Sequence, residues 1–199
     1  MFISFEGIDG SGKSTQARLL ADALRARGRD VVLTREPGGS AGGEDIRALV
    51  LNGPPDRWLP DTEALLFTAA RHDHVARTIR PALARGATVV CDRFADSTRL
   101  YQGATRGALR RFVDALHDLA IGLEPDRTFV IDLPPEEGLA RANARVGSEA
   151  RFEGFGLDFQ RRLHSGFHDL AREAPDRIRL IDGTGDPDAV HARVWNALP

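Results

Sequence analysis

The stretch EGIDGSGKST, residues 6–15, constrains the fold more than any other part of the sequence. From Gly7 to Ser14 it matches the pattern G-x-x-x-x-G-K-[ST]. In this pattern a glycine-rich loop joins a strand to a helix, and its backbone N–H groups surround phosphate oxygens. A short apolar run at residues 2–5 precedes the loop and a helical pattern follows it, as the motif requires. The sequence therefore predicts a binding site for a nucleoside triphosphate.

Lys13 is the only lysine in the chain, and every other basic residue is an arginine. A loop closed around phosphate suits a compact ammonium on an unbranched stem better than a wide, planar guanidinium. We therefore expect Lys13 to reach the β- and γ-phosphates. The hydroxyl of Ser14, the next residue, is placed to bind Mg²⁺.

Composition limits the class of protein. The chain has 199 residues, enough for one domain with a hydrophobic core, and its formal net charge of -2 argues against nucleic-acid binding through a chain-wide basic surface. The single cysteine, Cys91, excludes an intrachain disulfide and a metal site built from several cysteines. Neither a signal peptide nor an apolar run of about 18 residues, the minimum for a membrane span, is present. We expect a cytoplasmic protein that binds neither nucleic acid nor membrane.

Short apolar runs alternate with longer helical patterns along the whole chain. The runs have the near-continuous apolar character of strands buried in a parallel sheet, and they cover residues 2–5, 31–34, 88–91, 128–132 and 178–182. The helical patterns cover residues 13–27, 43–51, 61–85, 105–119, 135–145, 157–173 and 187–198. This order predicts an α/β domain with helices on both faces of the sheet. Ligands of such sheets bind beyond the carboxyl ends of the strands, which directs attention to residues 6–15, 35–39, 92–93 and the segment after Asp132.

Four further motifs lie after or between the predicted strands: TREPGG (34–39), LLFTAARHDHV (65–75), DRF (92–94) and DSTRLYQG (96–103). Together with the glycine-rich loop they resemble the thymidylate kinase family, and the resemblance extends from Phe2 to about Asp186. That family transfers the γ-phosphoryl group of ATP to dTMP, giving dTDP and ADP for dTTP biosynthesis. The resemblance implies a single P-loop kinase domain over residues 1–199 with the nucleoside monophosphate kinase fold. That fold is a five-stranded parallel sheet of order 2-3-1-4-5 with helices on both faces, usually in a homodimer.

The resemblance also implies a set of site residues. The expected ATP-binding residues are Gly7, Asp9, Gly10, Ser11, Gly12, Lys13, Ser14, Thr15 and Arg141. The expected dTMP-binding residues are Asp9, Arg35, Glu36, Pro37, Phe67, Arg71, Arg93, Thr98, Tyr101 and Gln102. The expected catalytic residues are Lys13, Arg93, Arg151, Arg145 and Asp9, and the expected ligands of Mg²⁺ are Ser14 and Asp92.

These roles agree with the chemistry of phosphoryl transfer, in which positioning and charge stabilisation dominate. By resemblance, Arg93 bridges the donor and acceptor phosphates and Asp9 contacts the acceptor. Phe67 stacks on thymine, Arg71 hydrogen-bonds the base, and Tyr101 lies under the deoxyribose, where it disfavours ribonucleotides. Each assignment has a plainer alternative: Asp9 as a turn former, Phe67 as a core residue, and Asp92–Arg93 as a surface ion pair. The resemblance also favours a cis Glu36–Pro37 bond.

The segment 141–156 is basic, contains glycine, and separates two predicted helices. It resembles the lid that nucleotide kinases close to exclude water. Because the phosphate-binding loop carries no basic residue except Lys13, the sequence resembles the bacterial subgroup with its catalytic arginine in the lid, here Arg151 or else Arg145. A solvated charged loop is the alternative.

Other functions were weighed against this one. A kinase for another nucleoside monophosphate or for a deoxynucleoside shares the loop and the lid, but differs in the acceptor pocket. A GTPase requires an N-K-x-D motif, which a chain whose sole lysine is Lys13 cannot contain. An inactive scaffold is disfavoured because Lys13, Ser14, Asp92 and Arg93 are all present. The pair His72 and His74 stands at i and i+2, so on a helix the two rings face apart and do not share a metal.

Overall fold

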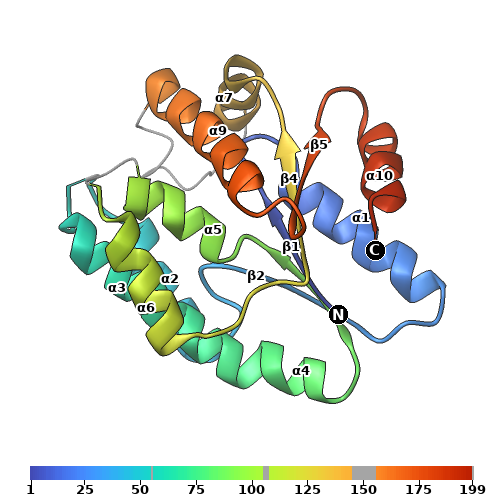
Figure 1. The fold of residues 1–199 in the computed structure, drawn as a ribbon, viewed down its shortest axis with the longest axis horizontal. Coiled ribbons are helices and arrows are strands. Elements are labelled where there is room, and N and C mark those ends of the chain that lie inside the picture. Colours follow the sequence, from blue (N-terminus) through green and yellow to red (C-terminus); the bar gives the residue numbers. More distant parts are fainter. Residues whose placement is uncertain (55, 105–107, 145–155, 199) are drawn as a thin grey trace.

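The computed structural model of the chain describes residues 1–54, 56–104, 108–144 and 156–198. Its centre is a sheet of five parallel strands in the order β2-β3-β1-β4-β5 (Figure 1). The strands are β1 (Phe2–Glu6), β2 (Val31–Arg35), β3 (Thr88–Asp92), β4 (Arg127–Asp132) and β5 (Ile178–Asp182). The order implied by the resemblance is confirmed, and each predicted strand lies within one residue of its observed bounds.

Helices fill the connections between the strands. They are α1 (Lys13–Ala26), α2 (Ala41–Leu51), α3 (Pro60–His74), α4 (Arg80–Ala84), α5 (Ala95–Thr98), α6 (Arg110–Ala120), α7 (Pro135–Asn143), α9 (Gly156–Glu173) and α10 (Pro187–Asn196). Two π-helical segments, η1 (Val75–Ile79) and η2 (Arg99–Ala104), continue α3 and α5. No helix in the described ranges combines the length and apolar character needed to cross a bilayer.

Two predicted helices differ from the observed ones. The pattern at residues 61–85 is a single helical run, but a π-helical turn divides it into α3, η1 and α4. The helix predicted at 105–119 begins at Arg110, whereas residues 95–104 form helical turns that the sequence did not predict. Residues 105–107 lie outside the described ranges. The segment 95–104 is too short and polar to show a helical period, and it depends on tertiary contacts described below.

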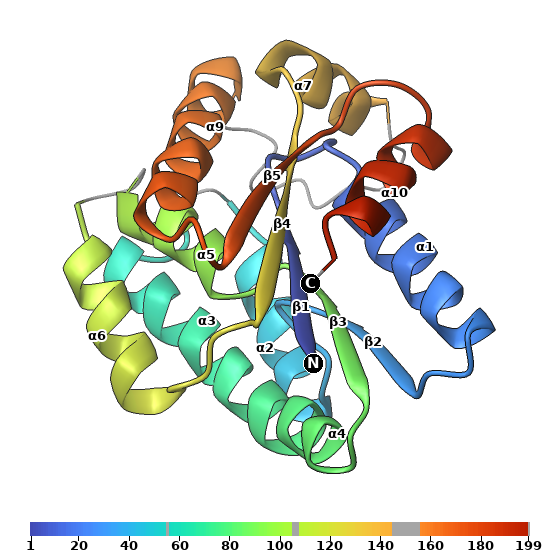
Figure 2. The ribbon, with the colours of Figure 1, turned by 45° about the vertical axis from the view of Figure 1, so that its right-hand side comes forward.

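Side chains alternate between the two faces of the sheet, as strand geometry requires. On one face, Ile3 and Phe5 of β1 form a core with Leu20 of α1 and Val194 of α10. On the other face, residues of β3 pack with η1, α4 and α5, and residues of β4 pack with η2 and α9. Figure 2 shows α1 and α10 on one side of the sheet and α9, α5 and α3 on the other.

The prediction that every strand is a near-continuous buried run is confirmed for β1, β3 and β4, but it is wrong for β2 and β5. Leu33 of β2 and Leu180 of β5 remain 37% and 39% exposed. The reason is topological: β2 and β5 are the edge strands, and helices cover them less completely than they cover the centre of the sheet.

Glu6, at the carboxyl end of β1, organises the chain after β3. Its buried carboxylate accepts hydrogen bonds from the backbone N–H groups of Phe94 (2.8 Å) and Ser97 (3.1 Å) and from the Ser97 hydroxyl (2.6 Å). Burial, and after it the charge of Asp96, raise the pKa of Glu6 to about 7. The sequence analysis assigned no role to Glu6.

We expect Glu6 to make the stability of the fold pH-dependent. A carboxyl group whose pKa rises on folding contributes most below its unfolded value of 4.5, and this contribution is lost as pH rises through about 7. Glu6→Gln offers similar hydrogen-bonding atoms without a charge. Between pH 4.5 and 8, the free energy of unfolding of the wild type should therefore fall relative to Glu6→Gln, by something on the order of 3 kcal/mol. Urea denaturation of both proteins across this range measures the difference, and parallel pH profiles would contradict the role of Glu6.

Candidate active site

The glycine-rich loop between β1 and α1 has the geometry of a phosphate cradle. Gly7, Gly10 and Gly12 have φ angles of 133°, 76° and 97°, in the region that favours glycine. A Cβ atom at Gly10 would lie 2.0 Å from the Gly138 carbonyl oxygen, so the loop packs tightly against α7. At Gly12 the corresponding position has no atom within 4 Å, and the N-terminus of α1 begins there. The loop therefore leaves space for an anion at a helix N-terminus.

Lys13 lies folded along this loop. Its side chain is buried, and Nζ donates a hydrogen bond of 2.6 Å to the carbonyl oxygen of Ile8. Burial, and next the neighbouring charge of Arg93, lower the pKa of Lys13 to about 8. A bound phosphate would stabilise the ammonium, so anion binding and protonation of Lys13 are coupled.

Ser14, in the first turn of α1, meets Asp92 at the end of β3. The Ser14 hydroxyl donates to Oδ2 of Asp92 at 2.5 Å. The other carboxylate oxygen, Oδ1, is buried and has no hydrogen-bond partner among the described residues. A carboxylate oxygen and a hydroxyl are hard oxygen ligands of the kind that Mg²⁺ prefers, so the two residues fit this ion.

Arg93 is held directly above the loop in a strained backbone conformation, with φ 69°. Its guanidinium pairs with Asp9, donates to the Ser97 hydroxyl at 3.0 Å, and lies over the Tyr101 ring, 5.1 Å from the ring centre. The plain alternative, a surface pair between Asp92 and Arg93, is therefore wrong: Arg93 pairs with Asp9 instead, and its side chain is only 19% exposed.

Asp9 is the centre of this group. It accepts hydrogen bonds from Tyr101 Oη (3.0 Å) and from Gln160 Nε2 (3.3 Å), in addition to the pair with Arg93. Burial alone would raise the pKa of Asp9, but the charges of Arg93 and Lys13 outweigh burial and hold the pKa below its usual value. Burial also raises the pKa of the Tyr101 phenol, which remains a neutral donor.

A second buried network stands beside the first. The Glu36 carboxylate accepts from Arg71 Nε at 2.7 Å and lies 3.0 Å from Nδ1 of His74. Arg71 also donates to the Phe94 carbonyl (3.1 Å) and to the Thr98 hydroxyl (2.9 Å). The Glu36–Pro37 peptide bond is cis, as the resemblance implied. This network fixes the plane of the Arg71 guanidinium.

The two networks border one cavity, whose lining combines aromatic rings with a few convergent polar groups, as small-ligand sites do. Every predicted dTMP-binding residue except Arg35 lines it: Asp9, Glu36, Pro37, Phe67, Arg71, Arg93, Thr98, Tyr101 and Gln102. The amide of Gln102 is oriented by a 2.8 Å bond to Glu63. Phe67 both lines the cavity and packs on the core around η2 and α9, so its two predicted roles are compatible.

Two arginines approach the site from outside this cavity. Arg35 pairs with Glu44 at 3.3 Å and borders a neighbouring hollow that also includes Ser14 and Asp92. Arg47, on α2, donates to the Pro37 carbonyl at 2.6 Å. Burial, and next the charge of Arg35, lower the pKa of Arg47. The charge of Asp92 raises this pKa and that of Arg93 lowers it. The sequence analysis missed Arg47, for which the only signal was its helix directly after TREPGG.

A third hollow lies on the opposite side of the loop. It brings together the predicted ATP-binding residues Gly10, Ser11, Gly12, Thr15 and Arg141 with Gly183 and Gly185 of the segment after β5. Arg141 pairs with Glu137 one helical turn away at 2.5 Å. Gly7 does not line this hollow, because it packs against Ile131.

Some predicted residues cannot be placed. Arg145 and Arg151 lie outside the described residues, as does most of the predicted lid. The prediction that His72 and His74 face apart is confirmed, since His74 is buried against Thr34 and Glu36 whereas His72 is exposed.

Comparisons with known proteins identify one family. A family model described as thymidylate kinase matches residues 5–194. A thymidylate kinase from Ruegeria pomeroyi is 66% identical over 194 residues, which cover 98% of this chain and 92% of that protein. One from Dinoroseobacter shibae is also 66% identical, over 192 residues that cover 96% of this chain and 93% of that protein.

A solved structure leads to the same result. The crystal structure of thymidylate kinase from Ehrlichia chaffeensis superposes with a TM-score of 0.81 at 37% sequence identity, and the match covers 100% of this chain and 98% of that one. With a family model and close relatives that span nearly all of its length, the chain belongs to the thymidylate kinase family.

Proposed function

We infer that this chain is a dTMP kinase, which transfers the γ-phosphoryl group of ATP to dTMP and releases dTDP and ADP. One observation carries this inference beyond family membership. Asp9, a residue of the glycine-rich loop, and Arg93, which pairs with it, both line the cavity, and their charges act on the neighbouring Lys13. A nucleotide in the cavity and a triphosphate on the loop would meet at Arg93, which is the arrangement that direct transfer requires.

On the donor side, the N–H groups of the loop and the N-terminus of α1 would bind the β- and γ-phosphates together with Lys13. The third hollow, bordered by Arg141 and Gly183, suits the rest of ATP. We propose that Ser14 and the unpaired Asp92 Oδ1 hold Mg²⁺, directly or through water. The ion would offset phosphate charge during transfer.

On the acceptor side, we propose that Phe67 stacks on thymine and that Arg71, oriented by Glu36, hydrogen-bonds the base. Thr98, Tyr101 and Gln102 also line the cavity. The Tyr101 ring would lie under the sugar, with Thr98 and Gln102 as further contacts of the acceptor. Hydrogen bonds from Tyr101 and Gln160 hold Asp9 close to the place where the acceptor phosphate and its sugar would lie.

The acceptor phosphate would compete with Asp9 for Arg93. We propose that Arg93 then bridges the two substrates, and that Arg47 and Arg35 approach the acceptor phosphate from the side of Asp92. Arg151, or else Arg145, would supply the remaining positive charge from the lid at residues 141–156. Such an arginine stabilises the charge that develops on the transferred group.

We further propose that the single domain works as a homodimer in the cytoplasm. Leu49 of α2, Leu65 of α3 and Phe112 of α6 are 42%, 49% and 37% exposed. Since α3 packs against both α2 and α6, these apolar side chains belong to neighbouring helices that a second copy can cover.

The acceptor assignment is tested by ADP release with ATP and Mg²⁺ in the presence of dTMP, dUMP, dCMP, dGMP, UMP or thymidine. We expect a strong preference for dTMP, because the cavity offers a stacking ring and an oriented arginine to a pyrimidine base. Faster turnover of another nucleotide, or of thymidine, would identify the alternative: a kinase for a different monophosphate or for a deoxynucleoside.

Replacement of Lys13 or Arg93 by alanine should lower kcat at least about 10³-fold, because each removes a cation that faces the transferred phosphoryl group. Arg172→Ala, which removes an exposed arginine paired only locally with Asp169, is a matched control and should retain wild-type kcat. Far-ultraviolet circular dichroism checks that each variant is folded. A folded Arg93→Ala protein with near wild-type kcat would disprove the bridging role.

Arg151→Ala should lower kcat far more than it weakens dTMP binding, because a lid arginine acts mainly on the transition state. Steady-state kinetics together with equilibrium binding of dTMP separate the two effects, and Arg145→Ala serves as the parallel variant. Weakened dTMP binding with kcat intact would instead make Arg151 a substrate-binding residue.

A further inference from the structure

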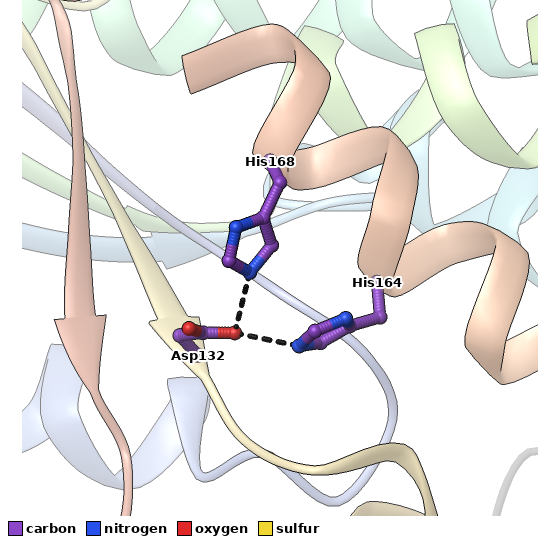
Figure 3. A group of neighbouring side chains, drawn as sticks. All are labelled: Asp132, His164 and His168. Atoms are coloured by element: carbon purple, nitrogen blue, oxygen red, sulfur yellow. Dashed lines mark hydrogen bonds and ion pairs between the residues drawn. The ribbon is translucent and has the colours of Figure 1, made fainter. Parts of the chain in front are cut away.

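Asp132, His164 and His168 form a compact cluster outside the cavity and beside the third hollow, because the Gly183 N–H donates to the Asp132 carbonyl at 2.7 Å. Asp132 ends β4, and the two histidines stand one turn apart on α9. Oδ1 of Asp132 lies 2.8 Å from Nε2 of His164 and 3.0 Å from Nε2 of His168, and both rings point toward the carboxylate (Figure 3). Within the described ranges, no other set of three His, Cys, Asp or Glu side chains is placed to share a metal ion.

The sequence carried a signal for this cluster that the sequence analysis overlooked. In the segment HSGFH the two histidines are four residues apart, so a helix places them on the same face. Asp132 is the last residue of a predicted strand, at the carboxyl edge of the sheet where ligands bind. Only the packing of α9 beside β4 brings the three residues together, and a single sequence does not specify that packing.

Core contacts fix the helix that carries the two rings, and the rings remain accessible to solvent. Leu163 and Phe167, the neighbours of the histidines toward the sheet, are almost fully buried and anchor α9. The side chains of Asp132, His164 and His168 are 29%, 30% and 32% exposed. An ion could therefore enter from solvent and meet ligands that are already held in place.

We propose that Asp132, His164 and His168 bind a divalent transition metal ion, for which Zn²⁺ is the representative. Two imidazole nitrogens and one carboxylate oxygen are ligands that zinc takes at about 2.0–2.2 Å. Tetrahedral coordination at these lengths separates the ligand atoms by about 3.3 Å. The Nε2–Oδ1 distances of 2.8 and 3.0 Å therefore need to open by only a few tenths of an ångström. The remaining position would belong to water or a ligand from solution.

Ligand chemistry distinguishes this site from the active-site magnesium. Mg²⁺ favours oxygen ligands, as Ser14 and Asp92 offer, whereas imidazole favours zinc and the later transition metals.

A metal here would join β4 to α9. The same helix carries Gln160, which stands one turn before His164. The Gln160 amide donates a hydrogen bond to Asp9 in the active site. Metal binding would therefore fix the helix whose Gln160 amide supports Asp9.

The binding experiment uses nucleotide-free full-length protein in excess Mg²⁺, which occupies the oxygen ligands of the active site. Co²⁺ is titrated while its visible absorption is recorded, and Zn²⁺ is then added as a competitor. We expect one equivalent of Co²⁺ to bind, with the visible absorption of a site of low coordination number, and we expect Zn²⁺ to displace the bound Co²⁺. His164→Ala and His168→Ala should each weaken Zn²⁺ binding at least tenfold. Loss of the groups that support a metal ligand already lowers metal affinity roughly 10- to 100-fold, and loss of the ligand itself should cost no less.

Two further variants control for other causes. His72→Ala removes an exposed histidine outside the cluster and should leave Zn²⁺ affinity unchanged. His168→Gln keeps a hydrogen-bond donor for Asp132 but has no imidazole. It should therefore fold normally and yet bind Zn²⁺ only weakly.

Thermal unfolding is a second readout that does not depend on activity. Zn²⁺ at about a hundredfold excess over its Kd should raise the Tm of the wild type and of His72→Ala by about 5 °C or more. His168→Gln should show little change. A Kd of roughly 1 mM or weaker, or equal Zn²⁺ binding by the wild type and the His164→Ala/His168→Ala double variant, would overturn the proposal.

Discussion

The register between β1 and β3 is the constraint on which the rest of the site depends. Phe5 pairs with Asp92, and the Arg93 N–H donates to the Phe5 carbonyl at 2.9 Å. This pairing brings the end of β3 beside the loop that leaves β1, so that Asp92 meets Ser14 and Arg93 meets Asp9. A shift of β3 by one residue would turn the Asp92 side chain to the opposite face of the sheet and displace Arg93 from the loop. Glu6 strengthens the same junction, because its buried carboxylate binds the backbone that follows Arg93.

Charge compensation explains why so many ionised groups tolerate burial here. Asp9 is matched by Arg93, and Glu36 by Arg71. The Tyr101 hydroxyl and the Gln160 amide complete the Asp9 carboxylate, and the His74 imidazole lies against that of Glu36. Breaking such a pair costs more than the pair contributes, because the remaining charge stays buried. An anionic substrate would not leave Arg93 unpaired, because its phosphate would take the place of Asp9 as the anionic partner. The site is thus preorganised for negative charge with little rearrangement of the cations.

The sequence predicted those parts of the molecule whose chemistry is local. The glycines of the loop, Lys13 and Ser14 occupy fixed positions in one motif, and the structure brings them together as expected. The helical turns at residues 95–104 escaped prediction because they rest on Glu6, 91 residues earlier in the chain. The exposure of Leu33 and Leu180 follows from the edge positions of β2 and β5, which local hydrophobicity does not encode. Arg47 was missed for the same kind of reason, because its place near Asp92 depends on how α2 packs.

Helix α9 connects the two polar clusters that the fold places on one side of the sheet. Gln160 reaches Asp9, and the next two turns present His164 and His168 to Asp132. On the buried side, Phe159, Leu163 and Phe167 hold the helix to the core around Val130 and Leu100. A rotation of α9 that displaced the histidines would therefore also move the Gln160 amide, because one rigid helix carries all three. The contacts to Asp132 and to Asp9 consequently report on the same degree of freedom, the orientation of α9 against β4 and the phosphate-binding loop.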